Sequence, residues 1–452
     1  MMNMKKIAIV LVALCMVLGA CQKEYLEKKP QKSLLVPRKL PELQALLDNV
    51  TLMNRQTSLT WIAGDDFTAS DAGVNSFLSV SERNSYRWNA DIYEGISSSD
   101  WNVPYEQTFC SNIILEALAE YPEQEQATQT YRSIKGAALF FRAFALYNLL
   151  QEFAVPYDPQ TAASVMGLPI RTQSDINLKP GRGTLAESYA QVMTDLESAL
   201  TLVPEKVPYN TRPGKAAVLG YLARTSLTMQ NYPLALKYAS DCLAQGVSLI
   251  DFNTTAPYLS PNGNVELIFN AGDVTSYSYI GSAEIGLSPS LFDTYATDDL
   301  RKTLFYFKRP NGNYYYRGSY SQNVAQFHGL ATDEVLLIKA EAAARTGDLS
   351  TALQALNELM QKRWKADTFQ PFATNDQNEA IRLILEHRRK ELVGRGTRWT
   401  DLRRLNQDPQ FAVTINRTVA GVNYVLLPND PRYTYPIPDG EINGSGIPQN
   451  PR

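Results

Sequence analysis

The chain has 452 residues, of which 44% are hydrophobic, and it carries a formal net charge of −3. That hydrophobic share is ordinary for a globular protein and excludes a disordered chain or a polytopic membrane protein, while the length exceeds a typical domain of about 100–200 residues. Binding to nucleic acid in general requires a basic surface, which this charge balance does not supply, so we expect no nucleic-acid partner.

The N-terminus has the pattern of an exported lipoprotein. Two lysines precede an apolar run from Ile7 to Leu18, which is too short to span a bilayer but is typical of a secretory signal. The run ends in Leu18-Gly19-Ala20-Cys21, which resembles the lipobox at which bacterial lipoproteins are processed. We therefore predict a signal peptide over residues 1–20 and lipidation of Cys21, which would tether the chain to a membrane. The alternative is an ordinary signal peptide in which the cysteine is accidental.

Helical periodicity begins near residue 40. Apolar side chains recur every three or four positions, and Thr184 with Glu187 forms the capping box that starts one helix. Cys110 and Cys242 lie within such patterns, so we expect two buried thiols rather than a disulfide. The predicted helices cover residues 40–53, 101–119, 131–153, 184–202, 213–229, 232–244, 332–346 and 349–363.

The last four of these helices form two pairs across tight turns, with alanines where the paired helices should touch, and they resemble the two-helix units of tetratricopeptide repeats. Residues 54–100, 250–330 and 405–452 break the pattern and are rich in loop-forming residues. The sequence therefore predicts an all-α, tetratricopeptide-like helical-repeat scaffold with long loop insertions and a few short β-strands. Loops on a rigid scaffold carry function disproportionately often.

Short motifs occur along nearly the whole chain: Tyr25-Leu26-Glu27 with Pro30, Trp101-Asn102-Val103-Pro104-Tyr105, residues 136–143, Gly167-Leu168-Pro169, residues 264–269, 334–342, 386–392 and 396–404, and Pro436-Ile437-Pro438. In this order they resemble the SusD/RagB family of nutrient-binding outer-membrane lipoproteins. Two positions depart from the family pattern: Gly394-Arg395-Gly396 lacks the more usual acidic residue, and Asp333-Glu334 lacks an arginine often found there.

The resemblance implies a cell-surface protein, lipid-anchored in the outer membrane, that captures a nutrient oligosaccharide or glycan. It implies delivery to a SusC-like TonB-dependent transporter, over which the lipoprotein closes like a lid. An oligopeptide ligand is the alternative within the family. The resemblance divides the chain into the signal peptide (1–20), an N-terminal SusD-like helical region (21–245), a variable insertion with short strands (246–330), and a C-terminal SusD/RagB helical region with its tail (331–452).

Aromatic residues in the loops are the candidates for a ligand site. Sugar rings present C–H faces that pack on aromatic rings, and their hydroxyls pair with forked donors and carboxylates. For each single residue, packing in a sheet is the favoured interpretation, whereas at least two of the set are expected in a site. The candidates are Trp61, Asp66, Trp88, Tyr277, Tyr279, Tyr315, Arg317 and Tyr320.

The sequence gives little support to enzyme chemistry. It contains only two histidines, His328 and His387, and no HExxH, GxSxG, Walker or GxGxxG pattern, so we predict no catalytic residues, no cofactor and no metal site. The charged stretch from Glu386 to Glu391 is interpreted as a structural ion network, with Glu386 facing Lys390 and Arg388 facing Glu391. Two further alternatives are a surface glycoside hydrolase, which needs only two carboxylates, and a tetratricopeptide scaffold for envelope assembly.

Overall fold

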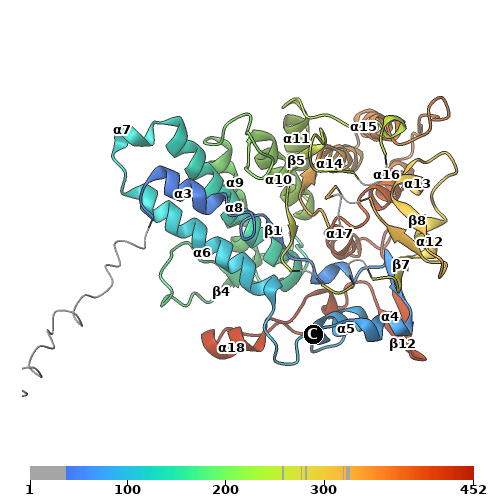
Figure 1. Ribbon diagram of the computed structural model, residues 1–452, viewed down its shortest axis with the longest axis horizontal. Helices are drawn as coiled ribbons and strands as arrows, with labels where there is room; N and C mark the ends of the chain where they lie inside the picture. Colours follow the sequence, from blue (N-terminus) through green and yellow to red (C-terminus); the bar gives the residue numbers. More distant parts are fainter. Residues whose placement is uncertain (1–36, 257–258, 276, 280–281, 319, 322–325) are drawn as a thin grey trace, which may run out of the picture.

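The computed structural model describes residues 37–452 with the exception of 257–258, 276, 280–281, 319 and 322–325 (Figure 1). The predicted signal peptide, Cys21 and the Tyr25-Leu26-Glu27 motif lie outside the described residues. Helices dominate the described part and the strands are short, which confirms the predicted fold class. No helix in that part combines the length and the apolar character needed to cross a membrane.

All the predicted helices are present. The longer helices are α3 (Leu40–Leu47), α5 (Val80–Arg87), α6 (Ser99–Ala119), α8 (Gln129–Phe153), α9 (Leu185–Leu200), α10 (Lys215–Thr228), α11 (Tyr232–Leu243), α14 (Thr332–Arg345), α15 (Leu349–Gln361), α16 (Gln377–Glu391) and α17 (Arg398–Leu405). The shorter ones are α4 (Asp71–Ser76), α7 (Glu123–Gln126), α12 (Pro289–Phe292), α13 (Arg301–Leu304) and α18 (Asp439–Ser445), with 3-10 turns η2 (Leu59–Trp61), η3 (Phe252–Thr254) and η4 (Pro431–Tyr433).

The strands of the described residues pair two by two, and no larger sheet forms among them. The pairs are β1 (Arg55–Gln56) with β6 (Gly272–Asp273), β2 (Phe67–Ala69) with β7 (Ile285–Leu287), β3 (Met166–Pro169) with β4 (Arg182–Thr184), β5 (Leu267–Phe269) with β10 (Leu330–Ala331), β8 (Tyr306–Lys308) with β9 (Tyr314–Tyr316), and β11 (Ile415–Val419) with β12 (Val422–Leu426). Among these six described pairs, β1 and β6 run parallel and the other five are antiparallel.

Two boundaries differ from the prediction. The first helix ends at Leu47 instead of residue 53, because Asp48 and Asn49 favour turns through their side chains. The stretch 54–100 also holds α4 and α5, although it was expected to be irregular. Ser79 and Glu82 form a capping box at the start of α5, and this local signal was present in the sequence.

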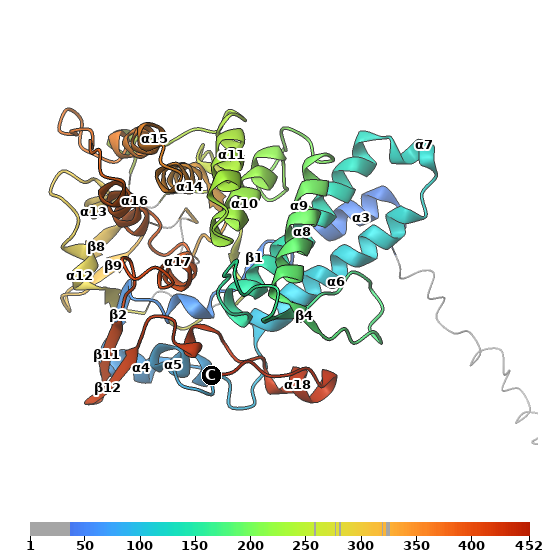
Figure 2. The same ribbon diagram turned by 180° about the vertical axis from the view of Figure 1, so that it is seen from behind.

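The helices pack in chain order from one end of the molecule to the other (Figures 1 and 2). Helix α8 lies between α6 and α9, and the series continues through α10, α11, α14 and α15. From Gly136 to Leu150, every residue of α8 except Arg142 is buried, so this helix forms the centre of the N-terminal core. Arg142 pairs with Asp195 of α9 at 2.7 Å and donates to Asn112 of α6 at 3.0 Å. Cys110 and Cys242 are free and buried, as predicted.

The two ends of the variable segment are hydrogen-bonded to each other along residues 267–273 and 326–331, and we call this paired region the stem. Strand β5 pairs with β10, and beyond it His328 N donates to Ala271 O at 3.0 Å. Asp273 then accepts a hydrogen bond from Gln326 N at 3.0 Å and contacts His328 Nε2 at 2.8 Å. The chain therefore enters and leaves this segment side by side, and the described residues between 274 and 321 lie beyond this stem.

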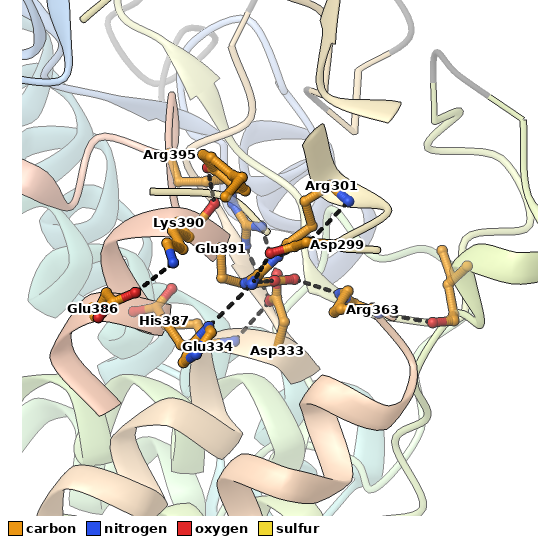
Figure 3. A network of polar contacts seen from close by, with 12 residues as sticks. Asp299, Arg301, Asp333, Glu334, Arg363, Glu386, His387, Lys390, Glu391 and Arg395 are labelled. Carbon is orange, nitrogen blue, oxygen red and sulfur yellow. Dashed lines mark hydrogen bonds and ion pairs between the residues drawn. The ribbon is translucent and has the colours of Figure 1, made fainter. Parts of the chain in front are cut away.

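A buried ion network joins the variable segment to the C-terminal helices (Figure 3). Arg363 pairs with Glu266 and with Glu391, each at 2.7 Å. The second oxygen of Glu391 pairs with Arg301 at 3.0 Å, and Arg301 also pairs with Asp299 at 2.7 Å. All five side chains are fully buried, so each charge depends on its partners.

The predicted ion network in α16 is partly confirmed. Lys390 pairs with Glu386 at 2.5 Å, as expected from their spacing. The expected pair between Arg388 and Glu391 is wrong, because Arg388 reaches Asp401 of α17 at 2.8 Å while Glu391 is held by the network just described. Arg388 and Glu391 therefore each pair with a residue on another element, and not with each other.

We predict that Arg363→Met destabilises the protein by about 3–5 kcal/mol, because it leaves Glu266 without its cation in a buried site. Urea denaturation measures the change. Lys237→Met is the matched control, since the Lys237–Asp241 pair is exposed and should contribute less than about 1 kcal/mol. Equal losses in the two variants would contradict the role assigned to the network.

We also predict a pH dependence that comes from His387. Burial, aided by Arg301 and Lys390, lowers the pKa of His387 to about 2 from its usual 6.5. Below pH 6.5 the unfolded chain therefore binds a proton that the folded chain does not, and the free energy of unfolding falls by about 1.4 kcal/mol per pH unit. Urea midpoints at pH 7.5, 6 and 5 should fall less steeply in His387→Gln. Parallel curves for the two proteins would refute this origin.

Candidate functional site

The hairpin of β8 and β9 has a buried face and an outer face. Tyr306 and Tyr316 pair across it and are both buried in the core. Because side chains alternate along a strand, the next pair, Phe307 and Tyr315, lies on the opposite face. Their rings are half-buried, with centroids 5.2 Å apart.

Two guanidinium groups lie against these rings. Arg309 lies over the Tyr315 ring at 4.0 Å, and Arg317 lies over the Phe307 ring at 5.6 Å. Arg317 also donates to the carbonyls of Leu304 and Thr303, which fixes its orientation. We call Phe307, Arg309, Tyr315 and Arg317 the hairpin platform. It combines flat apolar surfaces with forked donors.

The structure thus brings together two of the predicted site residues, Tyr315 and Arg317. Sequence reasoning did not select their neighbours Phe307 and Arg309. A signal existed, because three consecutive aromatic residues stand on each side of a turn that contains Asn311 and Gly312, and two such runs around an Asn-Gly turn indicate a β-hairpin.

Three other candidates form a stacked aromatic column. Trp61 stacks on Tyr279 with centroids 4.9 Å apart, and Tyr279 stacks on Tyr277 at 5.5 Å. Tyr277 donates to the buried carboxylate of Asp100, which also accepts from the Leu59 amide at 2.9 Å. Burial raises the pKa of Asp100 and of both tyrosines. The column holds the 54–61 segment against the variable segment.

The last three candidates are buried and bonded inside the protein. Asp66 pairs with Arg389 at 2.8 Å, and Trp88 donates its indole N–H to Ala63 O at 3.0 Å. Tyr320 donates to Glu266 of the ion network. The hollow beside Trp61 and Asp66 measures about 10 Å³, which holds at most one water molecule and no sugar ring. Ligand contact by any of the eight candidates stays a prediction.

Larger hollows open elsewhere on the surface. One groove of about 770 Å³ lies between the ends of α8 and α17, and another of about 830 Å³ borders α15. Neither is lined by any of the eight candidates. In the part of the chain that the structure describes, no group of three or more His, Cys, Asp or Glu side chains is arranged to hold a metal ion.

Two family models match the chain. Residues 24–227 match a model described as starch-binding and associating with the outer membrane, and residues 332–452 match a model described as the SusD family. Together the matches flank the variable segment. No curated protein matches the chain in sequence.

Solved structures share the fold at low sequence identity. A SusD superfamily protein from Bacteroides thetaiotaomicron is 23% identical with a TM-score of 0.74, over 92% of this chain and 100% of that one. A SusD-like carbohydrate binding protein from Bacteroides vulgatus is 22% identical with a TM-score of 0.71, over 90% and 97%. Surface glycan-binding protein A from Bacteroides fluxus is 17% identical with a TM-score of 0.69, over 92% and 100%.

We predict that truncation of two aromatic residues of the site region destabilises the protein to different extents. Trp88→Ala should destabilise the protein by about 3–5 kcal/mol, because the side chain is only 1% exposed and fully packed. Tyr315→Ala, on the outer face of the hairpin, should cost about 1 kcal/mol or less. Urea denaturation compares them, and similar losses would place Tyr315 in the core instead of on a surface.

Proposed function

Because this chain belongs to the SusD/RagB family, we propose that it binds a nutrient glycan at the cell surface and delivers it to a SusC-like TonB-dependent transporter in the outer membrane. The observation that carries the glycan assignment is the hairpin platform, in which Phe307 and Tyr315 lie between two guanidinium groups. The family model over residues 24–227, described as starch-binding, supports the same ligand class.

The platform would bind a saccharide through two kinds of contact. The C–H face of a sugar ring packs on an aromatic ring and removes apolar surface from water. The two guanidinium groups place positive charge and N–H donors beside these rings, where the hydroxyl oxygens of a stacked sugar would lie. The hairpin lies at the end of the molecule opposite α3 and α7, so the N-terminal helices leave it accessible (Figure 1).

The placement at the membrane follows from the N-terminal sequence. Cleavage before Cys21 and its lipidation would anchor the chain at a position 19 residues before Leu40, where α3 begins. The outer-membrane association named in one family model supports this location. The two solved relatives described as carbohydrate-binding and glycan-binding support the ligand class.

The proposed role is binding without covalent chemistry. Several carboxylates that a hydrolase could use are committed to structural ion pairs, among them Asp66, Glu266 and Glu391. Each of them already has an arginine partner. We therefore treat release of sugar from a polysaccharide as an outcome that would contradict the proposal.

We predict saturable binding of one glycan class by the chain from Gln22 to Arg452, measured by calorimetric titration against polysaccharides, oligosaccharides and peptide digests. Phe307→Ala and Tyr315→Ala should each weaken binding at least tenfold, because each removes a stacking surface. Tyr209→Ala is the matched control, since Tyr209 is 65% exposed and is not part of the hairpin platform.

Other outcomes would contradict parts of the proposal. Binding of peptides alone would keep the family and replace the ligand class. Release of reducing sugar would establish a hydrolase. Detergent extraction of the tagged lipoprotein should recover a transporter barrel, and recovery of envelope-assembly proteins without one would favour a scaffold.

A further inference from the structure

The part of the chain that carries the β8–β9 hairpin is basic, although the whole chain has a net charge of −3. From Leu300 to Thr332 the sequence contains five Lys and Arg residues and no Asp or Glu. The residues before it, 289–299, add three aspartates, so the whole stretch keeps a surplus of positive charge. A local surplus of this kind attracts ligands of the opposite sign to one part of a surface.

One of these five cations is neutralised inside the protein. Arg301 is fully buried and pairs with Asp299 at 2.7 Å and with Glu391 at 3.0 Å. The other four side chains are half-buried or exposed, and they are Lys302, Lys308, Arg309 and Arg317. The hairpin and its surroundings therefore carry positive charge at the surface.

The two lysines lie beside an aromatic pair that adjoins the hairpin. Tyr314 of β9 stacks on Phe292 of α12, with ring centroids 3.6 Å apart. Lys302 lies 4.9 Å from the centre of the Phe292 ring, and Lys308 lies 5.7 Å from the centre of the Tyr314 ring. Helices α12 and α13 lie next to the hairpin in both views (Figures 1 and 2). The lysines thus add to the positive charge around the hairpin platform.

The two arginines of the hairpin platform border the same pair of rings. Arg309 lies 4.0 Å from the centre of the Tyr315 ring and 6.0 Å from that of Phe307. Arg317 lies 5.6 Å from the centre of the Phe307 ring. The two rings are themselves only 5.2 Å apart and belong to the outer face of the hairpin. A sugar unit placed on the platform would therefore lie close to both guanidinium groups.

The contacts of these arginines orient them without adding negative charge. Arg317 donates to the carbonyl oxygens of Leu304 and Thr303 at 3.2 and 2.7 Å, and both acceptors are neutral. Arg309 lies over an aromatic ring, which engages the flat face of a guanidinium while its N–H donors point outward in the guanidinium plane. Carboxylates and other anionic oxygen groups are the acceptors that such a fork of donors matches.

We propose that the hairpin platform binds an anionic saccharide, whose carboxylate or sulfate group lies against Arg309 and Arg317 while the sugar ring packs on Phe307 or Tyr315. A carboxylate or sulfate group projects from the edge of a sugar ring, so one unit can make both contacts. The shared chemistry of the two ligand classes is an anionic oxygen group on a sugar. This inference rests on the proposed function for the place of the site, and it adds a preference for negative charge.

The test compares charged glycans with their neutral counterparts. Galacturonan, alginate, a sulfated galactan and a sulfated fucan are titrated calorimetrically into the chain from Gln22 to Arg452, each beside its carboxyl-reduced or desulfated form. At least one charged glycan should bind about tenfold more tightly than its neutral form, because only the charged form pairs with the guanidinium groups. Preference for a uronan would identify a carboxylate, and preference for a sulfated glycan would identify a sulfate. Equal affinity within every pair would overturn the inference.

Two variants test whether the charge preference comes from the platform. Arg309→Gln and Arg317→Gln each remove one positive charge and keep an amide donor, and each should weaken binding of the preferred charged glycan about tenfold. Arg132→Gln is the matched control and should leave the affinity unchanged. Arg132 is also an exposed arginine that donates to a carbonyl, that of Thr201 at 2.8 Å, but it lies in the first turn of α8 next to α7.

A salt series and unfolding curves separate the effect of charge from an effect on folding. Raising the ionic strength from about 0.05 to about 0.5 M should weaken binding of the charged glycan about threefold or more, because salt screens interactions between exposed charges. Binding of a neutral glycan should not change. Thermal unfolding midpoints of both variants should stay close to that of the unaltered chain, since neither side chain is fully buried. Should one variant unfold early, the other still decides the question.

The outcomes separate this inference from the proposed function. Saturable binding of neutral glycans alone, dependent on Phe307 and Tyr315, would overturn the charge preference and leave the proposed function intact. A charge preference that persists undiminished in both arginine variants would overturn the platform as the place where the anionic group binds. Silence toward every glycan, charged or neutral, would refute both.

Discussion

The fold depends on the shared position of Arg363 between two buried carboxylates. Arg363 follows α15 by two residues, Glu266 lies in the variable segment just before β5, and Glu391 ends α16, so one guanidinium fixes three parts of the chain relative to each other. The guanidinium also lies 3.9 Å from the Phe252 ring, which leaves no room for water on that side. Charges that are buried in this way tolerate little displacement, because a charge that moves away from its ion-pair partners has no water to replace them. The loops that carry the proposed site are therefore attached to a rigid base.

Most helices could be predicted because their signals are local. Apolar periodicity, a capping box and short turns occupy a few consecutive residues, and they placed α8, α9 and both helix pairs close to their observed bounds. The ion network could not be predicted in the same way. Glu266 and Arg363 are separated by 97 residues, and nothing near either of them in the sequence indicates the other. The expected pair of Arg388 with Glu391 was wrong for the same reason, because helical spacing permits a contact but tertiary packing selects the partner.

Amino-acid composition could not tell which aromatic residues belong to the candidate site. With 25 tyrosines in the chain, an aromatic residue in a loop is equally compatible with packing and with binding. Tyr315 and Tyr316 are adjacent, yet one lies on the outer face of the hairpin and the other in the core. Strand alternation separates them once the pairing is known, whereas Trp88 and Tyr320 are placed by contacts with distant segments. The groove beside α17 could not be predicted from the sequence, because it is lined by a helix end and a 3-10 turn that meet only in the folded chain.

The stem at the base of the variable segment would allow that segment to be replaced by one of a different sequence. Because residues 267–273 and 326–331 are bonded to each other, the ends of everything between them are held at a fixed separation. A longer or shorter insertion in a loop of that segment that makes no contact with the scaffold changes mainly the entropy of closing the loop, by about 0.6 kcal/mol for each doubling of length. The contacts of Tyr277 with Asp100 and of Arg301 with Glu391 have to be kept, because they join the segment to the rest of the chain. The part of such a protein that carries the proposed ligand site can therefore vary in sequence while the helical scaffold stays the same. The stem is also the place where this segment would best be joined in a chimera of two relatives.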